Sequence, residues 1–403
     1  MVSNALLVAL IFLASITFAA GETPPAAQTT AQIYSDGVES LYNLDFDQAE
    51  EHFRRLTAAE PENPANWNQL ASVLWLRIVA RQEKLNLESF SGASLGTDDS
   101  KDIVGEQEEK QLRDTISTAI ARADDLLRRN SKDTRALYAK GVTKAQLSAF
   151  EALAKRSYFA AHKAAQEARD LHRQVLKLEP GNKDAPLAIG IYDYAIGSIP
   201  SWLRFFLGVF GVGGNKELGL SAVAGVAQNG IRASTDAKML LVVMYNREKR
   251  YGESLKVLGE LQTHYPRNYL LELSKASIHS RLQQWEYAID TYETVLEKID
   301  AHEEGYGSLD RTRLQLLLAK AHLDNSEVTE AMTIYMEVVA SARSTDTDRA
   351  NARLWLGRLY DLMKDRTNAV AQYDAILSLD CDPRLKDQAR KYKQYPFGVN
   401  GKF

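Results

Sequence analysis

The sequence predicts an all-α solenoid, in which antiparallel helical hairpins stack one after another. Three observations predict this fold. From Ala31 onward, apolar residues recur at intervals of three and four, the spacing of one face of an α-helix. Only 10 prolines occur in 403 residues, and strand-like alternation is nearly absent. A small residue followed four positions later by a large one also recurs in the C-terminal half, which indicates a repeated unit.

These small and large residues mark the second helix of each hairpin. The pairs are Ser254/Leu258, Ala288/Tyr292, Ala331/Tyr335 and Ala369/Tyr373. Successive pairs are 34, 43 and 38 residues apart. A small side chain lets two helices approach closely, and a large side chain four residues later lies on the same face and fills the space beside it. We therefore expect one hairpin per interval, with loop insertions in the two longer intervals.

Matching residues occupy the first helices and the N-terminal unit. They are Leu241, Tyr245, Leu318, Ala319, His322, Leu356, Gly357 and Tyr360, and near the N-terminus Gly37, Ala49, Phe53, Pro61, Trp67, Leu70 and Ala71. The pattern resembles the tetratricopeptide-repeat family over about residues 31 to 381. That resemblance implies a right-handed superhelix of seven or eight hairpins, which the polar helix at about 383–392 would cap.

The first twenty residues differ from the rest of the chain. Residues 5–16 are mostly apolar and are followed by small residues, which predicts a secretory signal peptide. We expect cleavage after Ala19 or Gly21 and export to a bacterial periplasm. The alternative is an uncleaved N-terminal membrane anchor. The expected organisation is a signal peptide at 1–21, a linker at 22–30, a superhelix at 31–395 and a tail at 396–403.

Two segments interrupt the repeat. Residues 81–110 are polar and contain glycine, which predicts a solvated insert. Residues 187–214 are apolar and glycine-rich, and they form either a hairpin tucked into the superhelix or an apolar patch offered to a membrane or partner. The candidate patch residues are Trp202, Leu203, Phe205, Phe206, Leu207 and Phe210. Residues 198–220 resemble the tetratricopeptide-39 group, which includes the yeast inclusion-body clearance protein and implies an adaptor role.

Charge and motifs exclude several functions. The formal net charge is -4, and the 49 basic and 53 acidic residues are spread along the chain, so no basic face for nucleic acid is expected. Cys381 is the single cysteine, which excludes an internal disulfide. None of the seven histidines forms a His-Glu-x-x-His pair. We therefore predict no catalytic residue, cofactor or metal site.

Binding is the function that remains. We expect a non-catalytic scaffold that holds a segment of a protein partner in the concave groove lined by the first helices. The candidate groove residues are Met239, Val243, Asn246, Leu273, Ser277, Arg281, Leu316, Lys320, Arg358 and Asp361. One alternative is membrane-associated assembly or lipid handling through the apolar 199–210 segment. Another is an enzyme whose site no motif reveals. The sequence does not identify the partner or the oligomeric state.

Overall fold

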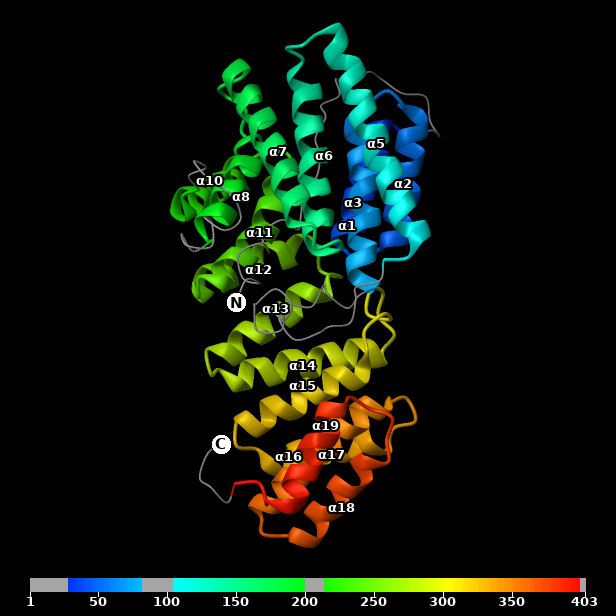
Figure 1. Cartoon of the computed structure of the whole chain (residues 1–403), viewed down its shortest axis with the longest axis vertical. Helices are drawn as coiled ribbons and strands as arrows, with labels where there is room; N and C mark the ends of the chain where they lie inside the picture. The colour runs from blue at the N-terminus through cyan, green and yellow to red at the C-terminus, as the bar shows by residue number, and fades with distance from the viewer. Residues whose placement is uncertain (1–27, 82–103, 200–213, 399–403) are drawn as a thin grey trace. The chain divides into compact units, whose positions relative to one another are not determined.

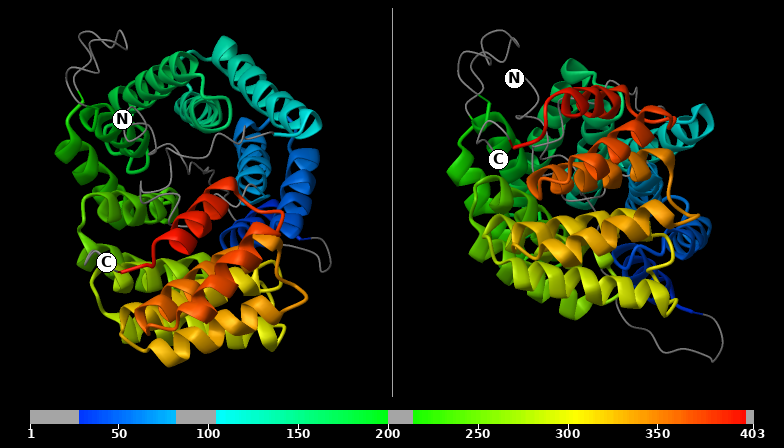
Figure 2. Two further views of the ribbon diagram at one scale, coloured as in Figure 1. Left: turned by 60° about the horizontal axis from the view of Figure 1, so that its bottom comes forward. Right: turned by 90° about the horizontal axis from the view of Figure 1, so that it is seen from below.

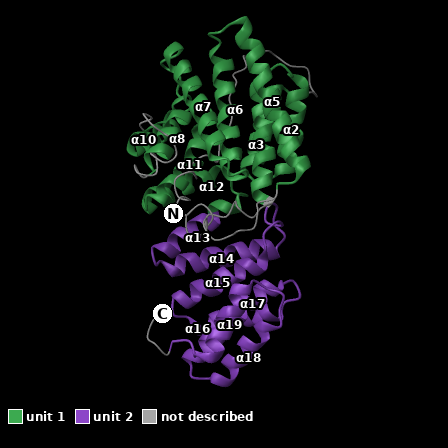
Figure 3. Cartoon of the chain, in the orientation of Figure 1, with its two compact units in different colours: residues 1–271 green, residues 272–403 purple. Residues whose placement is uncertain are grey.

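The computed structural model describes residues 28–81, 104–199 and 214–398, and every regular element in these ranges is an α-helix. Contacts divide the chain into two compact units, unit 1 at residues 1–271 and unit 2 at residues 272–403 (Figure 3). The helices are labelled in Figure 1. They are α1 (Thr30–Tyr42), α2 (Phe46–Ala59), α3 (Pro64–Arg81), α5 (Glu106–Arg129), α6 (Thr134–Leu153), α7 (Tyr158–Leu178), α8 (Pro186–Gly197), α10 (Lys216–Asn229), α11 (Ser234–Arg247), α12 (Tyr251–His264), α13 (Tyr269–Arg281), α14 (Trp285–Asp300), α15 (Arg311–Asp324), α16 (Val328–Ala340), α17 (Asp346–Leu362), α18 (Arg366–Leu377) and α19 (Pro383–Gln394).

In the described residues these helices form eight consecutive hairpins followed by α19. The first members of the hairpins are α1, α3, α6, α8, α11, α13, α15 and α17. This arrangement confirms the predicted all-α solenoid of tetratricopeptide-type hairpins. The described part of the predicted 81–110 insert includes the first turn of α5, which begins at Glu106.

The turn inside the hairpin repeats along the chain. In five hairpins, the second residue after the first helix has a positive φ although it is not glycine. These residues are Leu44, Lys249, Gln283, Ser326 and Lys364. The last four are 34, 43 and 38 residues apart, the same spacings that the sequence pairs predict. The two longer intervals contain the connections at residues 301–310 and 341–345, so the insertions lie between hairpins.

Each hairpin is held together by close packing of its two helices. A Cβ atom built on Gly357 of α17 would lie 2.5 Å from the Tyr373 ring of α18, so only glycine fits. Gly37 of α1 is similarly close to the Phe53 ring of α2. All eight members of the predicted small and large pairs are buried. These eight residues therefore form part of the core, which is the role expected for them.

Candidate partner-binding surfaces

In unit 1 the predicted groove residues Met239, Val243 and Asn246 lie on one face of α11, because they are four and three residues apart. All three side chains are partly buried. The Oδ1 atom of Asn246 is buried and has no hydrogen-bond partner among the described residues. This face therefore presents apolar surface and one unused acceptor.

In unit 2 the predicted groove residues of α13 share one face and differ in exposure. Leu273 and Ser277 are partly buried, whereas Arg281 is exposed at the end of the helix. On α15, Leu316 packs against the core that α15, α16 and α17 share. Leu316 is therefore partly used for folding, and Arg281 is the candidate with the freest side chain.

Three further groove candidates are engaged within unit 2. The Lys320 ammonium of α15 bonds Asp324 and lies 5.8 Å from the centroid of the Trp355 ring. Arg358 of α17 also lies over Trp355, at 4.6 Å. The carboxylate of Asp361 has no exposed surface and accepts bonds from the Tyr373 hydroxyl and the Arg366 guanidinium, both at 2.8 Å.

Asp361 accepts one more bond, from the backbone N–H of Phe397 at 2.9 Å. Its two oxygens therefore serve the fold of the last hairpin and the C-terminal residues. In this conformation Asp361 is a structural residue and not a groove side chain that a partner could contact. Sequence periodicity places it on the first helix but does not reveal that the chain's own C-terminus covers it.

Unit 1 closes on itself through hydrogen bonds between residues far apart in sequence. The Tyr42 hydroxyl at the end of α1 donates to Oδ1 of Asp236 on α11, and both residues are buried. Nδ2 of Asn268 donates to the Tyr42 carbonyl at 2.6 Å, and the Arg267 guanidinium pairs with Asp45 at 2.7 Å. Figure 2 shows α1 to α12 following one another around an arc. We call these contacts between residues 42–45 and residues 236 and 267–268 the closure.

The first helices of unit 1, with the connections that lead into α8 and α11, bring a group of polar and aromatic side chains within electrostatic reach of one another. We call this group the inner cluster, and it comprises Tyr34, Gln69, Tyr138, Asp184, Arg232 and Asp236. One carboxylate oxygen of Asp184 accepts the backbone N–H groups of residues 231–233, which begin the α11 hairpin. Nη1 of Arg232 is buried and has no hydrogen-bond partner among the described residues. The cluster therefore contains a charged donor that the fold leaves unused.

The electrostatics of the inner cluster keep its hydroxyl groups protonated. The pKa of Tyr34 is raised to about 12, mainly by burial; the charges of Asp236 and Asp184 also raise it, and the hydrogen bond from Gln69 and the charge of Arg232 oppose the shift. Burial also raises the pKa of Tyr138 well above its usual value. Both tyrosines are therefore neutral at physiological pH. Two carboxylates beside one guanidinium make the cluster unsuited to a phosphate and better suited to neutral polar groups such as peptide amides.

Sequence reasoning did not find the inner cluster. Its members come from the first helices of four hairpins and from the connections before α8 and α11, and no spacing or motif connects them. The only signal is indirect, since Tyr34 and Tyr138 lie on first helices where groove residues are expected. Their convergence depends on the closure, which joins residues 194 positions apart.

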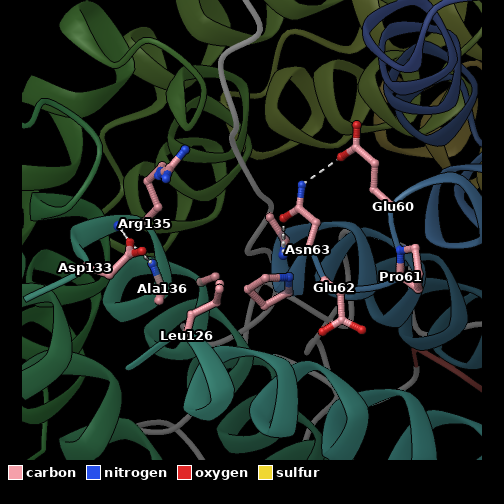
Figure 4. Close-up of a pocket in the computed structure, with 11 residues that line it drawn as sticks. Glu60, Pro61, Glu62, Asn63, Leu126, Asp133, Arg135 and Ala136 are labelled. Carbon is pink, nitrogen blue, oxygen red and sulfur yellow. Dashed lines mark hydrogen bonds between the residues drawn. The ribbon is translucent and has the colours of Figure 1, made fainter. Parts of the chain in front are cut away.

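A separate pocket of about 380 Å³ lies between the start of α3 and the start of α6 (Figure 4). Its walls include Pro61, Leu126 and Ala136. Two acidic side chains at the pocket are already engaged. Asp133 accepts the N–H groups of residues 135 and 136 and caps α6, while Glu60 accepts a bond from Asn63 at 3.0 Å. These contacts are structural and leave the pocket mainly apolar.

The apolar patch predicted at Trp202, Leu203, Phe205, Phe206, Leu207 and Phe210 lies outside the described residues. The helices on either side of it are packed closely. A Cβ on Gly214 would lie 2.6 Å from the backbone nitrogen of Gly197, so the end of α8 and the residue two positions before α10 meet at one point. We call this point the neck. The Tyr194 hydroxyl and the Lys216 ammonium both bond Glu248, at 2.8 and 2.6 Å, and fix α8 and α10 to α11 beside the neck.

Within the described residues, no three His, Cys, Asp or Glu side chains come together in a way that could hold a metal ion. None of the described helices is both long and apolar enough to cross a membrane.

Solved structures of helical-repeat proteins resemble this chain. A tetratricopeptide repeat protein from Parabacteroides merdae is 16% identical, with 76% of this chain and 91% of that chain covered and a TM-score of 0.30. Yeast Tom70 is 12% identical, with 91% and 88% covered and a TM-score of 0.34. The human IFIT1 dimer with m7Gppp-AAAA is 13% identical, with 90% and 83% covered and a TM-score of 0.37. At these scores, none of the three informs on partner or activity.

No protein-family model matches the chain. No curated protein matches it either.

Proposed function

We propose that the chain is a non-catalytic scaffold that holds a segment of a protein partner against the inner faces of its first helices. The observation that carries this proposal is the inner cluster of unit 1, where the partly buried Tyr34 and Tyr138 lie within electrostatic reach of Arg232, whose Nη1 is unused. Protonated hydroxyls and a guanidinium donate hydrogen bonds, and the backbone carbonyls of an extended segment accept them. The apolar face of Met239 and Val243 would receive side chains of the same segment.

The test compares two surfaces of unit 1. The wild-type mature chain, a variant with Arg232→Ala and Met239→Glu, and a control with Lys256→Ala on the exposed side of α12 are each immobilised. Periplasmic extract of the source bacterium is passed over them, and retained proteins are identified by mass spectrometry. We expect one partner on the wild type and the control that the double variant loses, with the melting temperature of all three unchanged. If the double variant retained the partner as well as the wild type does, the proposal would be wrong.

Export is part of the same proposal. It is supported by the apolar leader at residues 5–16 and the small residues that follow it. Mass spectrometry of the mature N-terminus in fractionated cells tests it. A soluble periplasmic product beginning at Ala20 or Glu22 is expected, whereas an intact N-terminus in the membrane fraction would favour an anchored protein.

The neck favours a second candidate function, association with membranes through the apolar segment. Because the backbone of Gly197 lies against Gly214, the two helices that flank the apolar segment meet at one point. Flotation with phosphatidylethanolamine and phosphatidylglycerol vesicles tests this function. Binding that is lost in Trp202→Glu would support it, and no flotation of the wild type would remove it. The likeness of residues 198–220 to the tetratricopeptide-39 group supports an adaptor role in either case.

A further inference from the structure

One guanidinium in unit 2 is surrounded by aromatic rings. The Cζ atom of Arg358 lies 4.6 Å from the centroid of Trp355, 5.1 Å from that of Tyr392 and 5.2 Å from that of Phe397. Its Nη2 atom donates to Oε1 of Gln388 at 2.6 Å. Its Nε is buried without a partner, and none of the described carboxylates pairs with it. The side chain is therefore held mainly by cation–π contacts. We call Arg358 with these three rings the Arg358 cage.

Two of the three rings belong to the C-terminal part of the chain, and they are attached differently. Tyr392 lies on α19, a helix that buries Leu385 and Ala389 and whose last turn accepts bonds from Arg366. Phe397 lies beyond that helix, in the short segment 395–398. The Tyr392 ring is thus fixed by a helix, whereas the Phe397 ring depends on the contacts of this segment alone.

Those contacts are few. The backbone N–H of Phe397 donates to Oδ2 of Asp361 at 2.9 Å, and its ring meets that of Tyr392 at 5.3 Å. Gly398 has a φ of +84° and lies against Leu362. The Tyr395 side chain remains 63% exposed. The Tyr395 N–H caps α19 by bonding the Lys391 carbonyl at 2.8 Å, so beyond Tyr395 one ring and one backbone hydrogen bond account for most of the attachment of this segment.

Pro396 gives the segment a defined chemistry. Proline has no N–H and favours an extended residue before it, so the first N–H that the segment offers to the cage is that of Phe397. The occupant of the cage is thus an aromatic residue preceded by proline, with its N–H directed at Asp361 and its ring at Arg358.

We propose that the Arg358 cage is a binding site for a short proline–aromatic segment of the protein partner, and that residues 395–398 are its occupant in the free chain. This inference rests on the proposed scaffold function and adds the partner's chemistry. A partner segment displaces residues 395–398, because it offers the same ring and N–H and gains further contacts along the groove. A partner segment can bind only while residues 395–398 are out of the site. Its apparent affinity is therefore the intrinsic affinity multiplied by the fraction of time that the site is empty.

The experiment uses the full chain and the capped peptide Gln-Tyr-Pro-Phe-Gly, with 4-fluorophenylalanine in place of its Phe, followed by fluorine NMR titration. Phe397→Ala removes the competing ring, and we expect this variant to bind the peptide about tenfold more tightly than the wild type. Arg358→Ala added to Phe397→Ala should abolish that gain. Tyr395→Ala, a change at the exposed neighbour, should leave the affinity at the wild-type value.

Circular dichroism melting of each variant establishes that the fold is retained, and Arg358→Lys added to Phe397→Ala provides a milder change that should keep part of the binding. Equal affinity of the wild type and Phe397→Ala would overturn the proposal. So would a wild-type dimer that Phe397→Ala dissociates, because a second copy's C-terminus would then be the occupant. Neither result bears on the inner cluster of unit 1, so the scaffold proposal is tested separately by the retention experiment.

Discussion

Unit 1 and unit 2 are built from the same hairpin but complete their structures differently. In unit 1, the closure joins α1 to residues 236 and 267–268, so the first hairpin depends on residues almost 200 positions or more away. In unit 2, packing contacts connect successive helices, and α19 covers the last hairpin. The difference indicates that a local repeat alone does not determine cooperativity. Unit 1 should respond to damage as a whole, and unit 2 should respond hairpin by hairpin.

The largest expected effect comes from removing the ring at the same position of two hairpins. Phe53→Ala in unit 1 and Tyr373→Ala in unit 2 should each cost about 3–5 kcal/mol, because both rings are fully buried against glycine. Hydrogen exchange with mass spectrometry reads out where the loss appears. We expect Phe53→Ala to increase exchange in α11 and α12 as well as α1 and α2, and Tyr373→Ala to act on α17 to α19. Equally local effects would contradict the comparison.

The next largest expected effect is a loss of stability of unit 1 at acidic pH, caused by His172. His172 of α7 occupies the position that Phe53 and Tyr373 occupy in their hairpins, beside Gly141. Burial lowers its pKa from 6.5 to about 4, partly opposed by its bond to the Ala168 carbonyl. The folded state binds the proton less well than the unfolded state. The stabilisation that neutral His172 gives unit 1 is therefore fully present above pH 6.5 and is lost as the pH falls towards 4. The loss amounts to about 3 kcal/mol.

His172→Phe should remove that dependence, since phenylalanine does not titrate and fits the equivalent site elsewhere in the chain. Urea unfolding between pH 7 and pH 4 measures it. The wild type should lose stability over this range in unit 1, and the variant should lose clearly less. An identical pH profile for both proteins would show that His172 is not the acid-sensitive group.

A smaller effect tests the closure directly. Asp236→Ala leaves the Tyr42 hydroxyl buried without its acceptor, which should cost about 1–3 kcal/mol. Tyr42→Phe removes the hydroxyl as well, so the double variant should be less destabilised than the two single changes together predict. Chemical denaturation of all four proteins completes this double-mutant cycle. Strict additivity would mean that the bond contributes nothing to unit 1.

The smallest expected effect is a gain, and it should be equal in the two units. Lys249 in unit 1 and Lys364 in unit 2 have φ values of 59° and 63°, a conformation that costs a residue with a Cβ more than it costs glycine. Lys249→Gly and Lys364→Gly should each raise stability by up to about 1 kcal/mol, after the entropic cost of glycine is subtracted. Differential scanning calorimetry checks the sign. A fall in melting temperature for either variant would show that the lysine side chain makes a contact of comparable value.

The hairpins could be predicted from the sequence, but the side-chain clusters that several hairpins form together could not. Ala331/Tyr335 and Ala369/Tyr373 predict both the hairpin and its core because the packing they describe lies within one repeat. Asp361 and Arg358 were expected in the groove because periodicity gives the face of a helix but not what covers it. Tyr34, Arg232 and Asp236 could not be grouped at all, since their meeting depends on the accumulated rotation of several hairpins and not on any local pattern.

The closure also has a mechanical consequence. A pull on unit 1 near residues 28 and 271 would reach the bonds of Tyr42, Asp45, Arg267 and Asn268 before it reached the stacked hairpins between them. These bonds would carry the load in parallel and break together, after which the hairpins would extend one by one. Under force, unit 1 should therefore show one early rupture of the closure, followed by stepwise extension of the hairpins.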